Sequence, residues 1–138
     1  MGIFDWLFGG KKLKKEYHDN SVLSAEYEVI NGKKNGYYKD YYKSGALKVE
    51  TRFKDDLMSG KCKFYFENGN LSELSWHNKG EPALGSIWER YLENGELEEK
   101  IEISKKRNVS KKGNPFEFVE LLIYRKPDET KVKVFKEY

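Results

Sequence analysis

Apolar and polar residues alternate with a period of two along much of the chain. In the segment Lys61–Phe66, the even positions hold Cys, Phe and Phe, whereas the odd positions hold Lys, Lys and Tyr. This alternation is typical of a β-strand with one face packed and the other solvated. Polar stretches that contain glycine separate such segments, as expected of turns. The pattern therefore predicts a chain made mainly of β-strands joined by short connections.

Three segments share one pattern and define an internal repeat with a spacing of 24–26 residues: Gly36–Leu47, Gly60–Leu71 and Gly85–Leu97. Each begins with glycine, continues as an aromatic-rich strand, turns at Ser-Gly or Asn-Gly, and returns with a strand that starts at leucine. Asn-Gly is a strong hairpin signal, because glycine adopts positive φ without steric cost. The third segment has one additional residue in its first strand, which we expect a β-bulge to absorb.

The flanks of the repeats also read as strands. The sequence predicts a strand over residues 24–30, followed by a polar turn, directly before the repeats. This strand resembles the second half of a repeat whose first half is degenerate. Residues 116–125 and 131–138 flank the turn-like sequence Pro-Asp-Glu-Thr and predict a final hairpin of a different pattern, as expected of a capping unit.

We therefore predict one elongated structural domain. It comprises an N-terminal helix and polar leader (1–20), tandem β-hairpin repeats (21–104), and a basic loop with a C-terminal capping hairpin (105–138). A single hairpin is marginally stable in water, so the units must pair side by side to bury their apolar face. Consecutive strands are expected to form a twisted antiparallel meander.

Over residues 24–103 the repeats resemble the bacterial variant of the MORN repeat. The resemblance rests on Gly36, Tyr42, Gly45 and Leu47, on Gly60, Phe66, Asn68, Gly69 and Leu71, and on Gly85, Tyr91, Asn94, Gly95 and Leu97. The chain departs from the pattern at Ser44, where asparagine is usual, and at the longer third unit. The resemblance implies a partner-binding β surface without catalytic residues. Similar proteins include antitoxin-like or immunity-like proteins that neutralise a toxic protein, and membrane-associated scaffolds.

Composition favours a protein partner over nucleic acid. Of the 138 residues, 15% are aromatic, which argues against disorder, and the net charge is only +3. Glutamates are concentrated in residues 81–102, and a lysine-rich stretch, 105–112, follows at once. Adjacent patches of opposite charge suit electrostatic steering of a protein, although solvated faces alone would produce the same clusters. A basic loop near aromatic strands also occurs in single-strand binders, but the acidic neighbour argues against that function.

Aromatic residues exceed what one buried face requires. In the first unit, Tyr37 and Tyr41 alternate with Tyr38 and Tyr42, so both faces of the strand are aromatic. Tyrosine and tryptophan are enriched in interface hot spots. The alternative is that these aromatics stabilise the sheet through cross-strand pairs. The predicted partner-binding set is Tyr37, Tyr41, Tyr65, Trp88, Tyr91 and Glu93.

The residues available for catalysis are few, and we predict that the chain is not an enzyme. Its two histidines, His18 and His77, and its one cysteine, Cys62, have no zinc-like spacing. Cys62 alternates with phenylalanines, which predicts burial and not nucleophilicity, although a pairing with His77 on an adjacent strand is conceivable. The glycines are explained by turns, and the glutamates of 93–102 by solvent-facing positions. No cofactor or metal is expected, and a single cysteine favours a reducing compartment, the cytoplasm.

The N-terminal segment offers an alternative function. Residues 3–8 have helical apolar spacing, and lysines follow them, so Phe4, Trp6, Leu7 and Phe8 are candidate contacts with an anionic membrane surface. The competing interpretation is that this segment caps the sheet. The order of charges differs from that of a secretory signal, and no stretch reaches the length of a membrane span. The leading hypothesis is an antitoxin-like or immunity-like protein that blocks a cognate toxin; the alternative is a membrane-peripheral scaffold. The binding face and the oligomeric state stay open.

Overall fold

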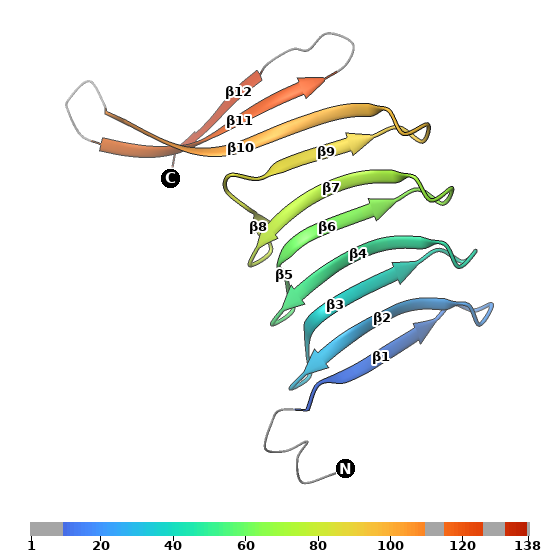
Figure 1. The fold of residues 1–138 in the computed structure, drawn as a ribbon. Coiled ribbons are helices and arrows are strands. Elements are labelled where there is room, and N and C mark those ends of the chain that lie inside the picture. Colours follow the sequence, from blue (N-terminus) through green and yellow to red (C-terminus); the bar gives the residue numbers. More distant parts are fainter. Residues whose placement is uncertain (1–9, 110–114, 126–131, 138) are drawn as a thin grey trace.

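In the computed structural model, the described residues are 10–109, 115–125 and 132–137; for 105–109, 115–121 and 132–137 the description covers the backbone only. These residues form one antiparallel sheet of 12 strands in a single open layer, without a helix (Figure 1). The strands are β1 Lys12–Tyr17, β2 Leu23–Ile30, β3 Lys33–Tyr41, β4 Leu47–Lys54, β5 Leu57–Met58, β6 Gly60–Tyr65, β7 Leu71–Asn78, β8 Glu81–Pro82, β9 Ile87–Tyr91, β10 Leu97–Val109, β11 Pro115–Arg125 and β12 Val132–Glu137.

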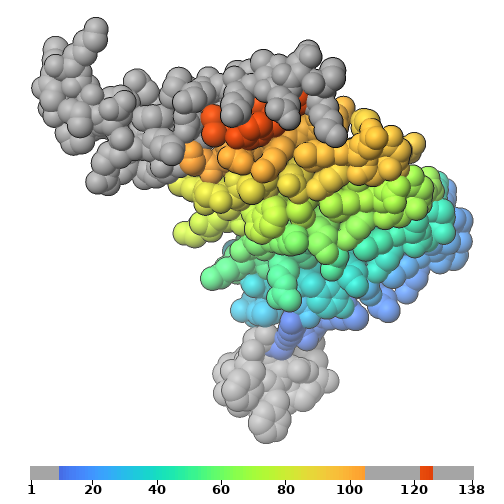
Figure 2. All heavy atoms as spheres, turned by 45° about the horizontal axis from the view of Figure 1, so that its top comes forward, coloured from blue at the N-terminus to red at the C-terminus, as the bar shows by residue number. Residues whose placement is uncertain are grey.

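Neighbouring strands in the sheet follow one another along the chain, which confirms the predicted meander of hairpins. The order is β1-β2-β3-β4-β6-β7-β9-β10-β11-β12, with the short strands β5 and β8 paired to β4 and β7. The space-filling view shows the same succession as stacked bands of sequence colour (Figure 2). Each hairpin thus contacts mainly the hairpins before and after it, as in other repeat proteins. The predicted N-terminal helix falls on residues 1–9, which lie outside the described residues.

The two ends of the repeat array close in different ways. At one end, which we call the loop end, each hairpin has a three-residue loop whose last residue has positive φ, as in Gly69 (φ 89°). The amide of Phe66 donates to the carbonyl of Asn70 (2.8 Å), and the amide of Gly69 donates to the carbonyl of Phe66 (2.9 Å). Asn68 itself keeps negative φ, so Asn-Gly forms a longer loop here than the two-residue turn it often signals. The opposite end has two-residue turns with positive φ at both positions, as in Asn31-Gly32.

One more hairpin precedes the three units seen in the sequence. Strand β1 lies where the sequence analysis assigned a polar leader, and it pairs with β2. Its loop has the same two hydrogen bonds as the others, from the amides of His18 and Ser21. Ser21 has φ 62° and takes the place of the loop glycine. Only its second strand, β2, was predicted from the sequence, because the loop lacks this glycine and because β1, with the sequence KLKKEY, shows no apolar alternation.

A bulge recurs at the same place in all four hairpins. The register shifts directly after the loop, where the return strand has one extra residue: Ser24, Lys48, Ser72 or Glu98. The additional residue of the third sequence unit was expected to form a bulge within its first strand. It lies instead at Gly85, in the connection before β9. The amide of Gly85 donates to the carbonyl of Ile103 (2.7 Å). The expectation of a bulge there was wrong because the connection, and not the strand, absorbs the insertion.

The buried residues all lie on one face, which we call the packed face. They are Ala25, Val29, Val49, Thr51, Cys62, Ser75, Glu99 and Ile103. Thr51, Cys62 and Ser75 form one cross-strand row of small side chains, bordered in the same row by Tyr38 and Trp88. Because the sheet has one layer, large side chains of neighbouring strands must cover the small ones.

A buried carboxylate joins the last array hairpin to the strand after it. Glu99 is 7% exposed and accepts a hydrogen bond from Arg125 Nε of β11 (2.5 Å). Arg90 Nη1 of β9 lies 3.5 Å from its other oxygen. The carboxylate is therefore paired on both sides, as a buried charge requires.

Candidate functional site

A row of tyrosines crosses the sheet at the loop end. Tyr17, Tyr41, Tyr65 and Tyr91 are the last residues of β1, β3, β6 and β9. Each pairs in register with the leucine that begins the return strand, for example Tyr41 with Leu47. The loop geometry and the bulge repeat in every unit, so the same residue position returns at the same place in each hairpin. Three predicted binding residues, Tyr41, Tyr65 and Tyr91, are thereby brought into one row, which we call the tyrosine row.

Carboxylates fix the hydroxyl groups of this row. The hydroxyl of Tyr41 donates to Glu26 (3.0 Å), and that of Tyr65 donates to Glu50 (3.4 Å), each a glutamate of the preceding hairpin. Tyr91 donates instead to Glu89 on its own strand (2.7 Å). Burial, followed by the hydrogen bond to the glutamate, raises the pKa of Tyr41 and of Tyr91 to about 12. Both side chains therefore stay neutral donors at physiological pH, with their rings half-buried and their orientation fixed.

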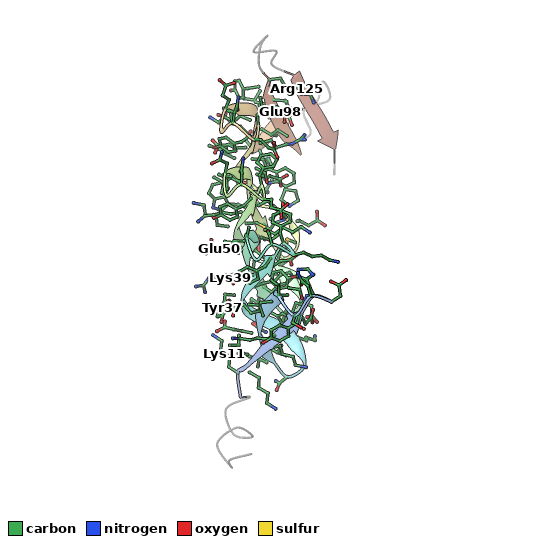
Figure 3. The ribbon with its side chains drawn as sticks, turned by 90° about the vertical axis from the view of Figure 1, so that its right-hand side faces the viewer. Lys11, Tyr37, Lys39, Glu50, Glu98 and Arg125 are labelled. Carbon is green, nitrogen blue, oxygen red and sulfur yellow. The ribbon has the colours of Figure 1, made fainter. Side chains whose placement is uncertain are left out.

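A ladder of alternating charges lies beside the tyrosine row, on the face opposite the packed face. We call this the charged face; in the edge-on view of Figure 3, Tyr37, Lys39 and Glu50 project to the same side. The register places Lys15, Glu26, Lys39, Glu50 and Lys63 side by side on successive strands. Lys63 Nζ lies 3.5 Å from Glu50. Opposite charges on adjacent strands stabilise the pairing, and they present a surface of mixed charge to solvent.

The predicted binding residues are divided between the two faces. Tyr37 shares the charged face with the tyrosine row, because it lies two and four residues before Lys39 and Tyr41. Trp88 lies on the packed face, where its ring centroid is 5.8 Å from that of His77. Trp88 Nε1 and His77 Nδ1 are buried without a hydrogen-bond partner. A period of two already separates Trp88 from Tyr91, which lies three residues later, but the bulge expected within this strand left the division open.

Glu93, the sixth predicted residue, lies in the loop of the β9–β10 hairpin and is exposed. Its main-chain carbonyl accepts hydrogen bonds from the side-chain amides of Asn68 (3.1 Å) and Asn70 (2.7 Å) in the preceding loop. Asn20 donates in the same way to the carbonyl of Lys43 (3.0 Å). The loop asparagine thus ties one hairpin to the next, a role that the sequence analysis missed. The recurrence of asparagine at positions 20 and 68 was the available signal.

A pocket of about 530 Å³ opens at the loop end between the β6–β7 and β9–β10 hairpins. Its wall combines aromatic and aliphatic side chains with three carboxylates and one guanidinium. The lining residues are Phe64, Phe66, Ser72, Glu73, Arg90, Tyr91, Leu92, Glu93 and Glu98. Two of the predicted residues, Tyr91 and Glu93, therefore meet here. The pocket has no signal in the sequence, because its walls come from two hairpins.

Cys62 and His77, the two side chains considered as a catalytic pair, lie on the adjacent strands β6 and β7. Cys62 is fully buried, and burial, its largest influence, raises the pKa of its thiol. His77 Nε2 lies 3.2 Å from the hydroxyl of Ser75, and His77 pairs with Gly60, not with Cys62. Within 10–104 and 122–125, where side chains are described, no three His, Cys, Asp or Glu residues group as metal ligands. In the same part of the chain, no helix is long and apolar enough to cross a membrane.

The hairpins with these loops and tyrosine-leucine pairs match a known repeat family in part of the chain. The profile of the family described as "MORN repeat variant" matches residues 34–55 and 58–78. The middle of this chain therefore carries MORN-like repeats. The matches cover β3–β4 and β5–β7, while the β1–β2 and β9–β10 hairpins share their loop geometry outside the matched segments. MORN repeats are non-catalytic modules that generally bind proteins or membranes. No curated protein matches the chain. The membrane candidates Phe4, Trp6, Leu7 and Phe8 lie outside the described residues.

Proposed function

We propose that the chain is a non-catalytic scaffold that binds a protein partner along the tyrosine row at the loop end. The tyrosine row carries this proposal: Tyr41, Tyr65 and Tyr91 recur on successive hairpins, are half-buried, and are held by hydrogen bonds to glutamates. Tyrosine contributes a large contact area and a polar group to interfaces. Side chains that are already ordered lose less entropy on binding, so a pre-positioned row favours affinity.

We further propose that the partner is a toxic protein, which the chain neutralises in the cytoplasm as antitoxin-like and immunity-like proteins do. The resemblance of the repeats to those of such proteins supports it. The alternating charges of the charged face support it as well, because mixed charge steers association and selects among protein partners. Inhibition by binding requires a complementary surface and no catalytic group, which fits the buried state of Cys62.

Co-expression tests the proposal. The chain is produced together with each protein encoded beside its gene, and growth and complex formation by size-exclusion chromatography are measured. We expect one of these proteins to be toxic alone, to be tolerated with the chain, and to elute with it as a complex. If no such protein is toxic or elutes with the chain, the toxin proposal fails.

Substitutions identify the surface. Tyr41→Ala with Tyr65→Ala is expected to weaken the complex by about 2 kcal/mol or more, the range of interface hot spots. Leu84→Ala is the control, because Leu84 is 54% exposed but lies outside the tyrosine row, in the connection before β9. Equal affinity of both variants for the partner would exclude the tyrosine row as the binding surface.

A further inference from the structure

The junction between the β6–β7 and β9–β10 hairpins differs from the junction before it. Between β3–β4 and β6–β7, the hydroxyl of Tyr42 donates to the carbonyl of Tyr65 (2.8 Å). Lys48 Nζ lies 5.6 Å from the centroid of the Tyr42 ring, as a cation–π pair. The residues that follow Tyr42 and Lys48 by 24 positions are Phe66 and Ser72. The aromatic ring is therefore retained in the next unit, whereas the hydroxyl and the ammonium group are absent.

The pocket of about 530 Å³ lies at this altered junction, and both Phe66 and Ser72 line it. The same junction also lacks the tyrosine-glutamate bond between hairpins. The position equivalent to Glu50 is Leu74, so Tyr91 turns to Glu89 of its own strand. The pocket therefore lies at a junction that lacks these two hydrogen bonds and is joined at its loops by Asn68 and Asn70. The preceding junction shows which group occupies the equivalent place, a lysine ammonium over an aromatic ring.

Charge in the pocket favours a cation. Within the part of the chain whose side chains are described, the carboxylates of Glu73 and Glu93 have no ion pair and no hydrogen bond. Arg90, the one basic residue of the lining, lies 4.0 Å from Glu98 and 3.5 Å from the buried Glu99. The guanidinium is thus already engaged, and two carboxylates remain for a ligand. A cation that stacks on an aromatic ring beside a carboxylate gains from both contacts.

We infer that the pocket receives a lysine or arginine side chain of the protein partner, with its charged group over Phe66 and beside Glu73 and Glu93. This inference rests on the proposed function, since it names the chemistry of the partner surface. A basic side chain fits the pocket because its aliphatic stem packs on Phe64 and Leu92 while its charge reaches the carboxylates at the rim. The partner residue then takes the role that Lys48 has one unit earlier.

Peptide binding tests the inference without the partner. The probes are acetyl-Lys-Gly-Lys-amide and acetyl-Arg-Gly-Arg-amide, with acetyl-Glu-Gly-Glu-amide as the negative control, titrated into the full chain. Amide chemical shifts in ¹H–¹⁵N spectra report both the site and the affinity. We expect the basic peptides to shift residues of the pocket, such as Ser72 and Glu93, and the acidic peptide to shift none.

Introduction of a lysine at the bulge position distinguishes binding in the pocket from general charge attraction. Ser72→Lys supplies the missing lysine from the chain itself and is expected to weaken peptide binding by about tenfold. Ser24→Lys is the matched control, because it adds the same charge at the same bulge of the β1–β2 hairpin and should leave binding unchanged. Glu73→Gln, which preserves shape, is expected to weaken binding as well and provides a second variant should Ser72→Lys fail to fold.

Two results would overturn the inference: shifts that avoid the pocket residues, or equal affinity for the basic peptides in Ser72→Lys and Ser24→Lys. Neither result would affect the capture of a protein partner through the tyrosine row, which the Tyr41 and Tyr65 variants report. Failure of the pocket and failure of the proposed function are therefore separate outcomes.

Discussion

Replacement of Gly36 by alanine should destabilise the sheet more than the same change at the repeat-equivalent Gly60. Both glycines have positive φ, +124° at Gly36 and +92° at Gly60, so each alanine is strained. A Cβ at Gly60 would meet no atom within 4 Å, whereas a Cβ at Gly36 would lie 1.8 Å from Glu28 Oε2. The difference between the two variants therefore reports what Glu28 contributes.

The magnitude follows from the contacts of Glu28. Its carboxylate accepts the amide of Tyr37 (2.9 Å) and pairs with Lys11 Nζ (2.5 Å). Positive φ costs an alanine about 1–2 kcal/mol in the left-handed region, and both variants incur backbone strain of this kind. Displacing the carboxylate at Gly36 further costs a charge-assisted hydrogen bond, about 1.5–3 kcal/mol. The half-exposed Lys11 pair adds about 0–1 kcal/mol. We expect a loss of about 2.5–6 kcal/mol for Gly36→Ala and about 1–2 kcal/mol for Gly60→Ala.

Urea denaturation at pH 7, followed by circular dichroism, measures both variants. The decisive control is Glu28→Ala, in whose background Gly36→Ala should cost only the backbone strain and therefore less than in the unsubstituted chain. Equal destabilisation by Gly36→Ala and Gly60→Ala would contradict a contribution of Glu28. An unchanged cost of Gly36→Ala in the Glu28→Ala background would contradict it as well.

Four further predictions follow. Ser44→Asn should raise the free energy of unfolding by about 0.5–1.5 kcal/mol in urea denaturation. Asparagines at this loop position, Asn20 and Asn68, donate to carbonyls of the next loop, so we expect Asn at position 44 to donate to the carbonyl of Glu67. Burial opposes ionisation of Glu28, but hydrogen bonds from Lys11 and the Tyr37 amide lower its pKa below the ordinary 4.5. The free energy of unfolding should therefore include a contribution from ionised Glu28 above pH 4.5, which is lost as the pH falls through the lowered pKa of Glu28. Glu28→Gln should show a smaller loss of stability over the same acidic range. The Cys62 thiol, buried and with a raised pKa, should react with iodoacetamide only after unfolding; rapid labelling of the folded chain would contradict its burial. The membrane alternative predicts that deletion of residues 1–10 abolishes co-sedimentation with anionic liposomes, and unchanged sedimentation would end it.

The strands and their connections could be predicted from the sequence because they depend on local preferences. Alternating residues such as Cys62 and Phe64 define a face, and Gly69 supplies the positive φ of the loop. Of the hairpin β1–β2, only the second strand was predicted, because Ser21 adopts the same positive φ without a glycine to signal the loop. The sequence likewise identified an excess of aromatics, but not the face on which each of them lies.

The candidate site depends on contacts between hairpins about 24 residues apart. The lateral register brings Glu50 to the hydroxyl of Tyr65 and Asn68 to the carbonyl of Glu93. It also makes Phe66 and Ser72 walls of a pocket. The sequence by itself determined the unit, because a hairpin forms from neighbouring residues. Only the tertiary structure decided the tyrosine row and the pocket, because both arise where one unit is placed against the next.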